Sequence, residues 1–143
     1  MTVKAILSSK GRDVSTIRPD ATLAEAAQLL SERRIGALVV ESAKEAVAGL
    51  LSERDIVHAV ASHGHAALGL AVEQVMTRKV VTCREGDTVG VIMERMTTGK
   101  FRHLPVVEDG RLVGIVSIGD VVKYRLSEME QESTALRDYI LTA

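Results

Sequence analysis

Apolar positions recur at the spacing of an amphipathic helix in two separate segments of the chain. In the first segment, Thr22 precedes apolar residues at i, i+3, i+4 and i+7, namely Leu23, Ala26, Ala27 and Leu30. In the second, Thr88 precedes the same spacing in Val89, Ile92, Met93 and Met96. Threonine is a favoured N-cap, and Glu25 completes a capping box in the first segment. Each segment is therefore predicted to begin a helix at its threonine.

Short apolar runs predict the strands that accompany these helices. Strands are expected over residues 14–18 and 80–84, over residues 37–41 and 104–108, and in two return segments that end at Ser52 and Ser117. The pair Asp109-Gly110 is typical of a two-residue hairpin turn, because both positions of such a turn favour positive φ. A further helix is expected after each serine. The predicted order of elements is thus β-α-β-β-α, given twice.

The two halves of the chain are copies of one unit. Residues 14–18 (VSTIR) align with residues 80–84 (VVTCR), and residues 49–55 (GLLSERD) align with residues 114–120 (GIVSIGD). The lead-in segments, residues 3–7 and 72–76, are also similar. One such unit leaves an apolar helix face exposed. Two units are therefore expected to pack about a pseudo-twofold axis.

The order of elements, the Thr-containing first strand and the closing motif Gly-h-h-Ser-x-x-Asp, in which h is apolar, resemble the cystathionine-β-synthase-type (CBS) domain family. The resemblance implies an α/β (α+β) fold with CBS repeat 1 at residues 3–66 and CBS repeat 2 at residues 72–126. Such a tandem pair is called a Bateman module. Residues 127–143 are expected to form an additional C-terminal helix. With no enzyme or channel attached, the chain is similar to the stand-alone bacterial members.

Composition narrows the classes of function. Apolar residues make up 46% of the chain, which favours a folded domain over disorder. A net charge of −1 and an aromatic content of two Tyr and one Phe argue against nucleic acid as a partner. No apolar run approaches the ~20 residues of a membrane-spanning helix, and no signal peptide is found. The single cysteine, Cys83, indicates a reducing compartment, so we expect a cytoplasmic protein with no membrane partner.

The motif Ser-x-x-Asp, at residues 52–55 and 117–120, is the strongest candidate binding feature. Its serine stands at a helix start, where free backbone N–H groups suit a phosphate. Its aspartate accepts hydrogen bonds only, which suits the adjacent hydroxyls of a ribose. The same motif is also an ordinary capping box, and its occurrence twice in register favours the binding interpretation. The family resemblance assigns the ribose to Asp55 and Asp120.

The first strand of each unit is a second candidate. The resemblance places Thr16 and Thr82 beside an adenine base, with Ile17 and Cys83 next to them. Threonine is equally an ordinary strand residue, so the functional role rests on the resemblance alone. Cys83 matches Ile17 and is expected to serve packing.

Residues 102–105 (RHLP) are a third candidate. Arg102 and His103 offer donors to a phosphate, although a solvated pair is an equal alternative. Pro105 indicates a strand that is irregular or lies at an edge. The matching Gly36 and Ala37 leave the other cleft roomier, so the two sites should differ. Phosphorylated ligands are expected on the Asp120 side.

The basic loop before the first strand and the histidines are two further features of the sequence. Residues 10–13 (KGRD) lengthen a basic loop by three residues relative to its counterpart, and Lys10 either grips a further phosphate or belongs to a solvated turn. The histidines at 58, 63 and 65 do not match a zinc spacing, so no metal is expected. Motifs of hydrolases, zinc proteases and Walker loops are missing. An enzyme, a catalytic residue and a catalytic cofactor are therefore not expected.

The sequence thus predicts a regulatory module that binds and senses an adenine nucleotide in the clefts between its repeats. AMP is the first expectation, with ADP, ATP or NAD(H) next. The alternatives are an S-adenosylmethionine binder and a ligand-free adaptor for a regulated protein. The expected nucleotide-binding residues are Lys10, Thr16, Ile17, Gly36, Ala37, Ser52, Arg54, Asp55, Thr82, Cys83, Arg102, His103, Leu104, Pro105, Ser117, Ile118, Gly119 and Asp120.

Apolar helix positions that one module leaves uncovered predict a homodimer. They are Val57, Val60, Val122 and a C-terminal stripe of Met129, Leu136 and Ile140. A narrow stripe of this kind is typical of a helix that docks onto another surface. The C-terminal helix is expected to dock on its own module or on a second copy.

Overall fold

The computed structural model describes residues 1–142, and its elements follow the order that the repeats predict. The first repeat contains β1 (Thr16–Ile17), α2 (Leu23–Arg33), β2 (Ala37–Val40), β3 (Gly49–Ser52) and α3 (Glu53–His63). The second repeat contains α5 (Val89–Gly99), β4 (His103–Glu108), β5 (Arg111–Ser117) and α6 (Ile118–Thr142). Three further helices are α1 (Val3–Lys10), η1 (Gly64–Gly69) and α4 (Val72–Val75).

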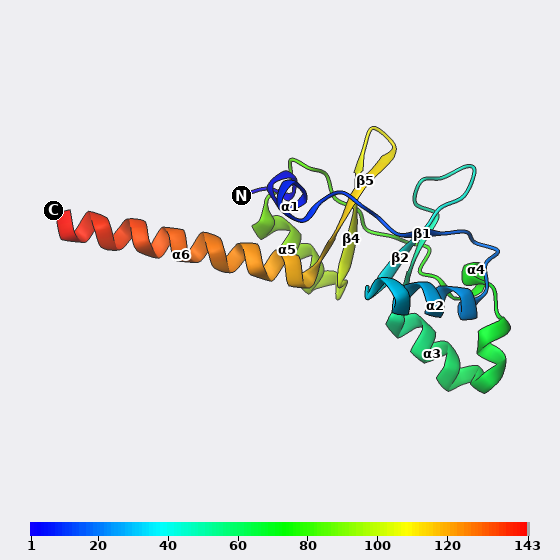
Figure 1. The fold of residues 1–143 in the computed structure, drawn as a ribbon. Helices are drawn as coiled ribbons and strands as arrows, with labels where there is room; N and C mark the ends of the chain where they lie inside the picture. Colours follow the sequence, from blue (N-terminus) through cyan, green and yellow to red (C-terminus); the bar gives the residue numbers. More distant parts are fainter. Residues whose placement is uncertain (143) are drawn as a thin grey trace.

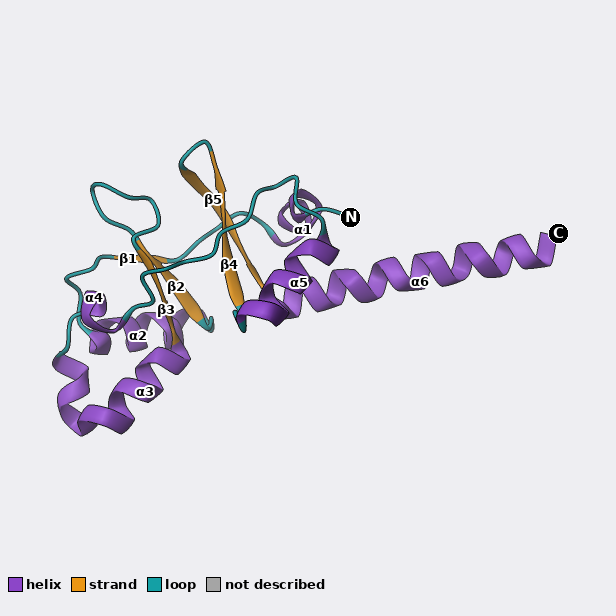
Figure 2. Ribbon diagram, turned by 180° about the vertical axis from the view of Figure 1, so that it is seen from behind, coloured by secondary structure: helices purple, strands orange, loops and turns teal. Residues whose placement is uncertain are grey.

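The two repeats lie side by side, each with its own small sheet and its own helices (Figure 1). Strand β2 pairs in parallel with β1 and antiparallel with β3, while β4 pairs antiparallel with β5. Figure 2 shows α2 and α3 grouped with the three-stranded sheet, and α5 and the start of α6 grouped with the two-stranded sheet. The mixed α and β architecture of two repeats is therefore confirmed.

The local signals that predicted helix and turn positions are confirmed. The Thr22 hydroxyl accepts a hydrogen bond from the Glu25 N–H at 3.2 Å, and the Glu25 carboxylate accepts one from the Thr22 N–H at 3.3 Å. At the start of α5 the Thr88 hydroxyl accepts a hydrogen bond from the Val91 N–H, without a reciprocal side-chain bond. Between β4 and β5, Asp109 and Gly110 have φ angles of 49° and 74°. Both angles are those of the predicted hairpin turn.

The first strand of the second repeat is shorter than predicted, and Pro105 explains why. In the first repeat, the Val39 N–H donates to the Ser15 carbonyl and extends the pairing of β1 with β2. Pro105 occupies the position of Val39 and has no N–H to donate. Only the bridge between Cys83 and Val106 remains, in the same register as Ile17 with Val40. Pro105 itself lies inside β4, an edge strand of a two-stranded sheet, and the pairing of β4 with β5 shifts register between Val106 and Val107, so both the edge position and the irregularity that Pro105 indicated are present.

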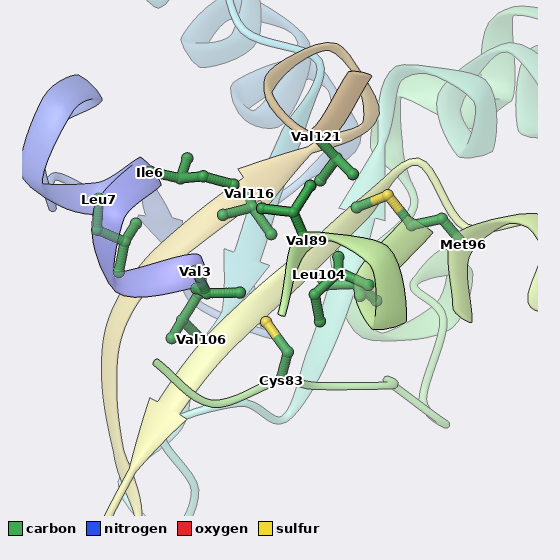
Figure 3. Close-up of a cluster of buried hydrophobic side chains, with 11 residues drawn as sticks. Val3, Ile6, Leu7, Cys83, Val89, Met96, Leu104, Val106, Val116 and Val121 are labelled. Carbon is green, nitrogen blue, oxygen red and sulfur yellow. The ribbon is translucent and has the colours of Figure 1, made fainter. Parts of the chain in front are cut away.

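The lead-in helices are exchanged between the repeats. Val3, Ile6 and Leu7 of α1 are buried in the hydrophobic core of the second repeat, together with residues of α5, β4, β5 and α6 (Figure 3). Val72 of α4 is buried in the core of the first repeat. Matching backbone bonds hold both helices, from the Val3 N–H to the Asp87 carbonyl and from the Val72 N–H to the Ala21 carbonyl. The exchange ties the two repeats into one unit.

The glycine of each closing motif has its place in this exchange. A Cβ atom on Gly114 would lie 2.7 Å from Cδ2 of Leu7 in α1. A Cβ atom on Gly49 would collide in the same way with the Met76 side chain that follows α4. A larger residue at either position would force these side chains away from the return strand. The motif Gly-h-h-Ser-x-x-Asp therefore begins with glycine for packing between the repeats.

Helix α6 runs without a break across the expected boundary at residue 126. It extends away from both repeats (Figures 1 and 2), and every residue from 129 to 142 is exposed. The expectation that this stretch docks on its own module is therefore wrong. Within residues 1–142 no helix combines the length and the apolar character needed to cross a membrane. Ala143, the last residue of the expected C-terminal helix, lies outside the described residues.

Candidate binding clefts between the repeats

Two cavities open between the repeats, and each takes its walls from both of them. The first, which we call the Asp55 cavity, has a volume of about 340 Å³. It is lined by Gly36, Leu50, residues 52–55 and His58 of the first repeat and by Thr77, residues 79–81, residues 100–103, Ser117 and Ile118 of the second. The second, the Asp120 cavity, has a volume of about 370 Å³ and is lined by Lys10, residues 13–15, residues 34–37, His103, Ile115, Ser117 and Asp120. Both volumes are typical of small-molecule sites.

The two cavities are counterparts under the pseudo-twofold relation of the repeats. Residues 79–81 and 100–103 of the Asp55 cavity align with residues 13–15 and 34–37 of the Asp120 cavity. In each cavity, a serine-aspartate motif of one repeat faces the strand-leading segments of the other repeat. This crossed arrangement decides which charged side chains meet.

The two cavities differ in charge because different residues stand at the positions that align between the two repeats. Lys79, Arg102 and His103 line the Asp55 cavity where Asp13, Gly36 and Ala37 line the Asp120 cavity. The Asp55 cavity has four lysine or arginine residues against two carboxylates, namely Arg54, Lys79, Lys100 and Arg102 against Glu53 and Asp55. The Asp120 cavity has two cations against two carboxylates, namely Lys10 and Arg34 against Asp13 and Asp120. An anionic ligand is therefore favoured in the Asp55 cavity.

Arg102 corrects one expectation from the sequence. Phosphorylated ligands were expected on the Asp120 side, since Arg102 and Asp120 belong to the same repeat. Because each cavity is built across the repeats, Arg102 instead lines the cavity that contains Asp55. His103 lines both cavities. Gly36 lines both cavities as well, while Ala37 lines the Asp120 cavity.

Both Ser-x-x-Asp motifs form complete capping boxes. At the start of α3, the Ser52 N–H donates to Asp55 Oδ2 at 2.8 Å, and the Asp55 N–H donates to the Ser52 hydroxyl at 3.3 Å. The Glu53 N–H donates to the Gly36 carbonyl at 2.9 Å and so continues the pairing of β2 with β3. Of the first three helical N–H groups, only that of Arg54 has no protein partner among the described residues. The helix start thus offers a ligand one free N–H group, fewer than the sequence alone predicts.

The two aspartates differ in what else they contact. Asp120 Oδ2 accepts hydrogen bonds from the Ser117 N–H at 2.9 Å and from Lys10 Nζ at 2.7 Å. Lys10 also donates to the Ile115 carbonyl at 3.0 Å, so the end of α1 is fastened to the second repeat. Burial alone would raise the pKa of Asp120, but the hydrogen bonds from Lys10 and Ser117 outweigh it and lower the pKa below the ordinary 3.8. Asp55 has no such cation on it in residues 1–142, so its carboxylate is the more accessible to ribose hydroxyls.

His103 stands in the wall between the cavities. Its ring lies beside Gly36, where a Cβ atom would be 3.4 Å from Cε1 of the histidine. Burial is the main cause that lowers the pKa of His103 below its ordinary 6.5, and the charge of Lys10 lowers it further. Asp120 and Glu53 act in the opposite direction, and Arg102 lowers the pKa again. The imidazole is therefore neutral near neutral pH and can gain a proton when an anion enters either cavity.

Several predicted site residues line neither cavity within the described chain: Thr16, Ile17, Thr82, Cys83, Leu104, Pro105 and Gly119. Cys83 and Leu104 are buried in the core of the second repeat, because alternate residues of a strand point to opposite faces. Burial raises the pKa of the Cys83 thiol to about 12. The Thr16 hydroxyl donates to Glu41. A contact of Thr16 or Thr82 with an adenine base stays a prediction.

Other residues line the cavities without having been predicted. They include Asp13, Ser15, Arg34, Glu53, Lys79, Val81 and Lys100. Ser15 and Val81 directly precede the two threonines, so the motif lies one residue from the cavity wall. Arg34 and Lys100 are the left-handed residues that end α2 and α5, with φ angles of 54° and 58°. Arg34 and Lys100 align with each other in the two repeats, and this alignment of basic residues is the sequence signal that could have identified them.

The cavities offer no metal site. Within residues 1–142 no group of three or more His, Cys, Asp or Glu side chains is placed to hold an ion. The side chains that line the two cavities offer hydrogen bonds and charge to a ligand.

Comparison with known proteins identifies the family. The CBS-domain family model matches the chain twice, over residues 3–62 and 72–127. The chain belongs to the CBS-domain family, whose members are regulatory modules. It is 31% identical to the Arabidopsis thaliana mitochondrial CBS domain-containing protein CBSX3 over 97% of this chain and 71% of that protein. It spans about a quarter of longer Arabidopsis relatives such as CBSCBSPB2, at 24% of their length.

Solved structures agree with this assignment. The CBS-domain containing protein ATU1752 from Agrobacterium tumefaciens is 52% identical with a TM-score of 0.84, over 87% of this chain and 92% of that one. The CBS domain pair of protein MJ0100, solved with 5′-methylthioadenosine and S-adenosyl-L-methionine, is 27% identical with a TM-score of 0.79, over 90% of this chain and 98% of that one. The tandem CBS pair predicted from the repeats is confirmed.

Proposed function

We propose that this chain is a sensor module that binds an adenine nucleotide in the Asp55 cavity, with AMP as the preferred ligand. The observation that carries the proposal is the charge of that cavity, which holds a cation excess and an aspartate with no cation on it. A carboxylate can accept hydrogen bonds from two adjacent ribose hydroxyls. A cluster of lysine and arginine side chains can bind a phosphate. The two features meet in one cavity of about 340 Å³.

The division of labour follows from the two walls. Asp55, with its capping box, is fixed at the start of α3 and is proposed to hold the ribose. Arg102, with Lys79 and Lys100 beside it in the lining, is proposed to hold the phosphate. Val80 and Val81 provide an apolar surface for the base. ADP, ATP and NAD(H) share these groups and remain alternatives to AMP.

The Asp120 cavity is proposed to be a second and weaker site. Its aspartate is already paired with Lys10, and its charged side chains balance. A ligand there must displace or accommodate the ammonium group. Binding at this site is therefore expected at higher concentration than at the Asp55 cavity.

S-adenosylmethionine is the main competing ligand, because the related domain pair of MJ0100 was solved with it. Its adenosine would suit Asp55, but it has no phosphate for the cations of the Asp55 cavity.

Thermal unfolding in the presence of AMP, ADP, ATP, NADH, adenosine and S-adenosylmethionine separates these ligands. At one hundred times the dissociation constant, a ligand raises the free energy of unfolding by about 2.7 kcal/mol. A larger rise with S-adenosylmethionine than with AMP would reverse the assignment, and no rise with any of them would favour a ligand-free adaptor.

The remaining parts of the proposal concern context. We propose that the module is a homodimer that regulates a partner protein, that it leaves its bound nucleotide unchanged, and that it resides in the cytoplasm. The exposed Val57 and Val60 of α3 and Val122 of α6 support association between copies. The single Cys83, buried in the core, is consistent with a reducing compartment. Chromatography of AMP and ATP incubated with the protein tests the absence of turnover, and product formation in proportion to protein would contradict it.

A further inference from the structure

Helix α6 carries an apolar seam along most of its length, and nothing in the described chain covers it. The seam follows the alternating spacing of four and three residues that defines a coiled coil, in Val122, Leu126, Met129, Ser133, Leu136 and Ile140. Its large members are exposed, with 56% of Leu126, 61% of Leu136 and 64% of Ile140 accessible. From Val122 to Ile140 the seam is about 27 Å long. A seam with this spacing, on a helix that leaves its own module, is the pattern of a helix that packs against another helix.

The charges beside the seam identify the partner. If Leu126 and Ser133 are a positions and Met129 and Leu136 are d positions, then Arg125 and Glu132 occupy g positions. Glu130 and Arg137 occupy the e positions that follow each of them by five residues. In a parallel pair of identical helices, each g residue faces the next e residue of the other helix.

Both of these cross-helix contacts join opposite charges. Arg125 faces Glu130 of the second copy, and Glu132 faces Arg137 of the second copy. Within one chain, Arg125 lies 3.7 Å from Glu128 and 4.0 Å from Glu132, so part of its charge is already engaged. Arg137 and Glu130 have no ion-pair partner in residues 1–142. A second copy in parallel supplies the missing partners.

We propose that α6 pairs in parallel with α6 of a second copy along the Val122–Ile140 seam, as a two-stranded coiled coil. The inference deepens the proposed homodimer by naming its interface, and it does not depend on the nucleotide. The small polar Ser133 at the centre of the seam limits the strength of the pair. The coiled coil therefore adds to contacts between the modules instead of replacing them.

Disulfide trapping in the full-length chain tests the proposal. Ile140→Cys places a thiol at an a position near the end of the seam, where the two copies meet only if the helices run parallel. Oxidation should convert most of this variant into a linked dimer on a non-reducing gel. Asp138→Cys, on the opposite face of the helix, is the matched control and should stay unlinked. Cys83 does not interfere, because it is 2% exposed and its thiol is held protonated.

The outcomes separate the alternatives. Equal linking of the two variants, or no linking of Ile140→Cys, would overturn the proposal. A mixture of Ile140→Cys and Val122→Cys chains that links to each other, while neither links to itself, would show an antiparallel pair and overturn it as well. If sedimentation still shows a dimer in these cases, the homodimer stands and only this interface fails.

Two further variants test the same interface by affinity in sedimentation equilibrium. Ser133→Ile should tighten the dimer by at least about tenfold, since it buries an apolar side chain at the centre of the seam in each copy. Glu132→Lys should weaken the dimer about two- to fivefold, and adding Arg137→Glu should restore it because the cross-helix charges are again opposite. A Ser133→Ile chain with unchanged affinity, or a double variant no tighter than Glu132→Lys, would contradict the coiled coil.

Discussion

Replacing Asp55 with asparagine removes one charge from the Asp55 cavity while keeping the size of the side chain. In the wild-type protein, Asp55 accepts the Ser52 N–H at 2.8 Å, and an asparagine oxygen can accept the same bond. The two ribose hydroxyls lose a charged acceptor, and a hydrogen bond to a charged group contributes roughly 1.5–3 kcal/mol. The AMP dissociation constant should therefore rise between about tenfold and about one hundredfold.

Asp120→Asn is the matched control, because Asp120 caps α6 with the same geometry as Asp55 caps α3. Both variants keep the hydrogen-bond acceptor but remove a negative charge from the first turn of a helix, so both should lower the free energy of unfolding by about 0.3–1 kcal/mol. Only Asp55→Asn should reduce AMP affinity at the tighter site. Calorimetric titration with AMP and thermal unfolding of each variant measure the two effects separately. If both variants bind AMP as the wild type does while melting lower, the motif is only a helix cap and the site assignment fails.

Three further outcomes follow from the charges around the cavities. Arg102→Ala should raise the AMP dissociation constant by at least about tenfold and leave that of adenosine unchanged, and equal losses for both ligands would contradict a phosphate contact. The ratio of wild-type to His103→Gln affinity for AMP should increase as pH falls from about 8 to about 6, since a bound phosphate raises the depressed pKa of His103 and binding to the wild type takes up a proton there; a ratio that does not change with pH would contradict this. The lowered pKa of Asp120 in the folded protein contributes stability at pH values above the ordinary pKa of an aspartate, and this contribution is lost as pH falls through the pKa of the folded state. Lys10→Met should therefore have a free energy of unfolding lower than that of the wild type by under about 1 kcal/mol near pH 7 and equal to it near pH 2. A difference that persists in acid-unfolding curves at about pH 2 would contradict this.

Much of the fold could be predicted from the sequence, because it rests on local signals that occur twice. The caps at Thr22 and Thr88 and the turn at Asp109-Gly110 depend on residues adjacent in sequence. The repeat itself predicted the family, which the two family-model matches confirm. The exchange of α1 and α4 between the repeats was not predicted, since it depends on contacts between residues far apart, such as Leu7 with Gly114.

The candidate site could be predicted only in part for the same reason. Asp55 and Arg102 were both chosen from the sequence, but their meeting in one cavity follows from the crossed packing of the repeats. Lys10 was expected in a loop, either gripping a further phosphate or in a solvated turn, and it instead ends α1 and pairs with Asp120. The cavity walls are formed by residues 13–15 and 79–81, which precede the two threonines, and not by Thr16 and Thr82 themselves.

A crystal structure of the protein grown with AMP tests the central proposal most directly. The account predicts one nucleotide in the Asp55 cavity at concentrations that leave the Asp120 cavity largely empty. Its two ribose hydroxyls should donate to Asp55, and its phosphate should contact Arg102. A nucleotide bound only in the Asp120 cavity, or one in the Asp55 cavity with its phosphate turned away from Arg102, would contradict the account.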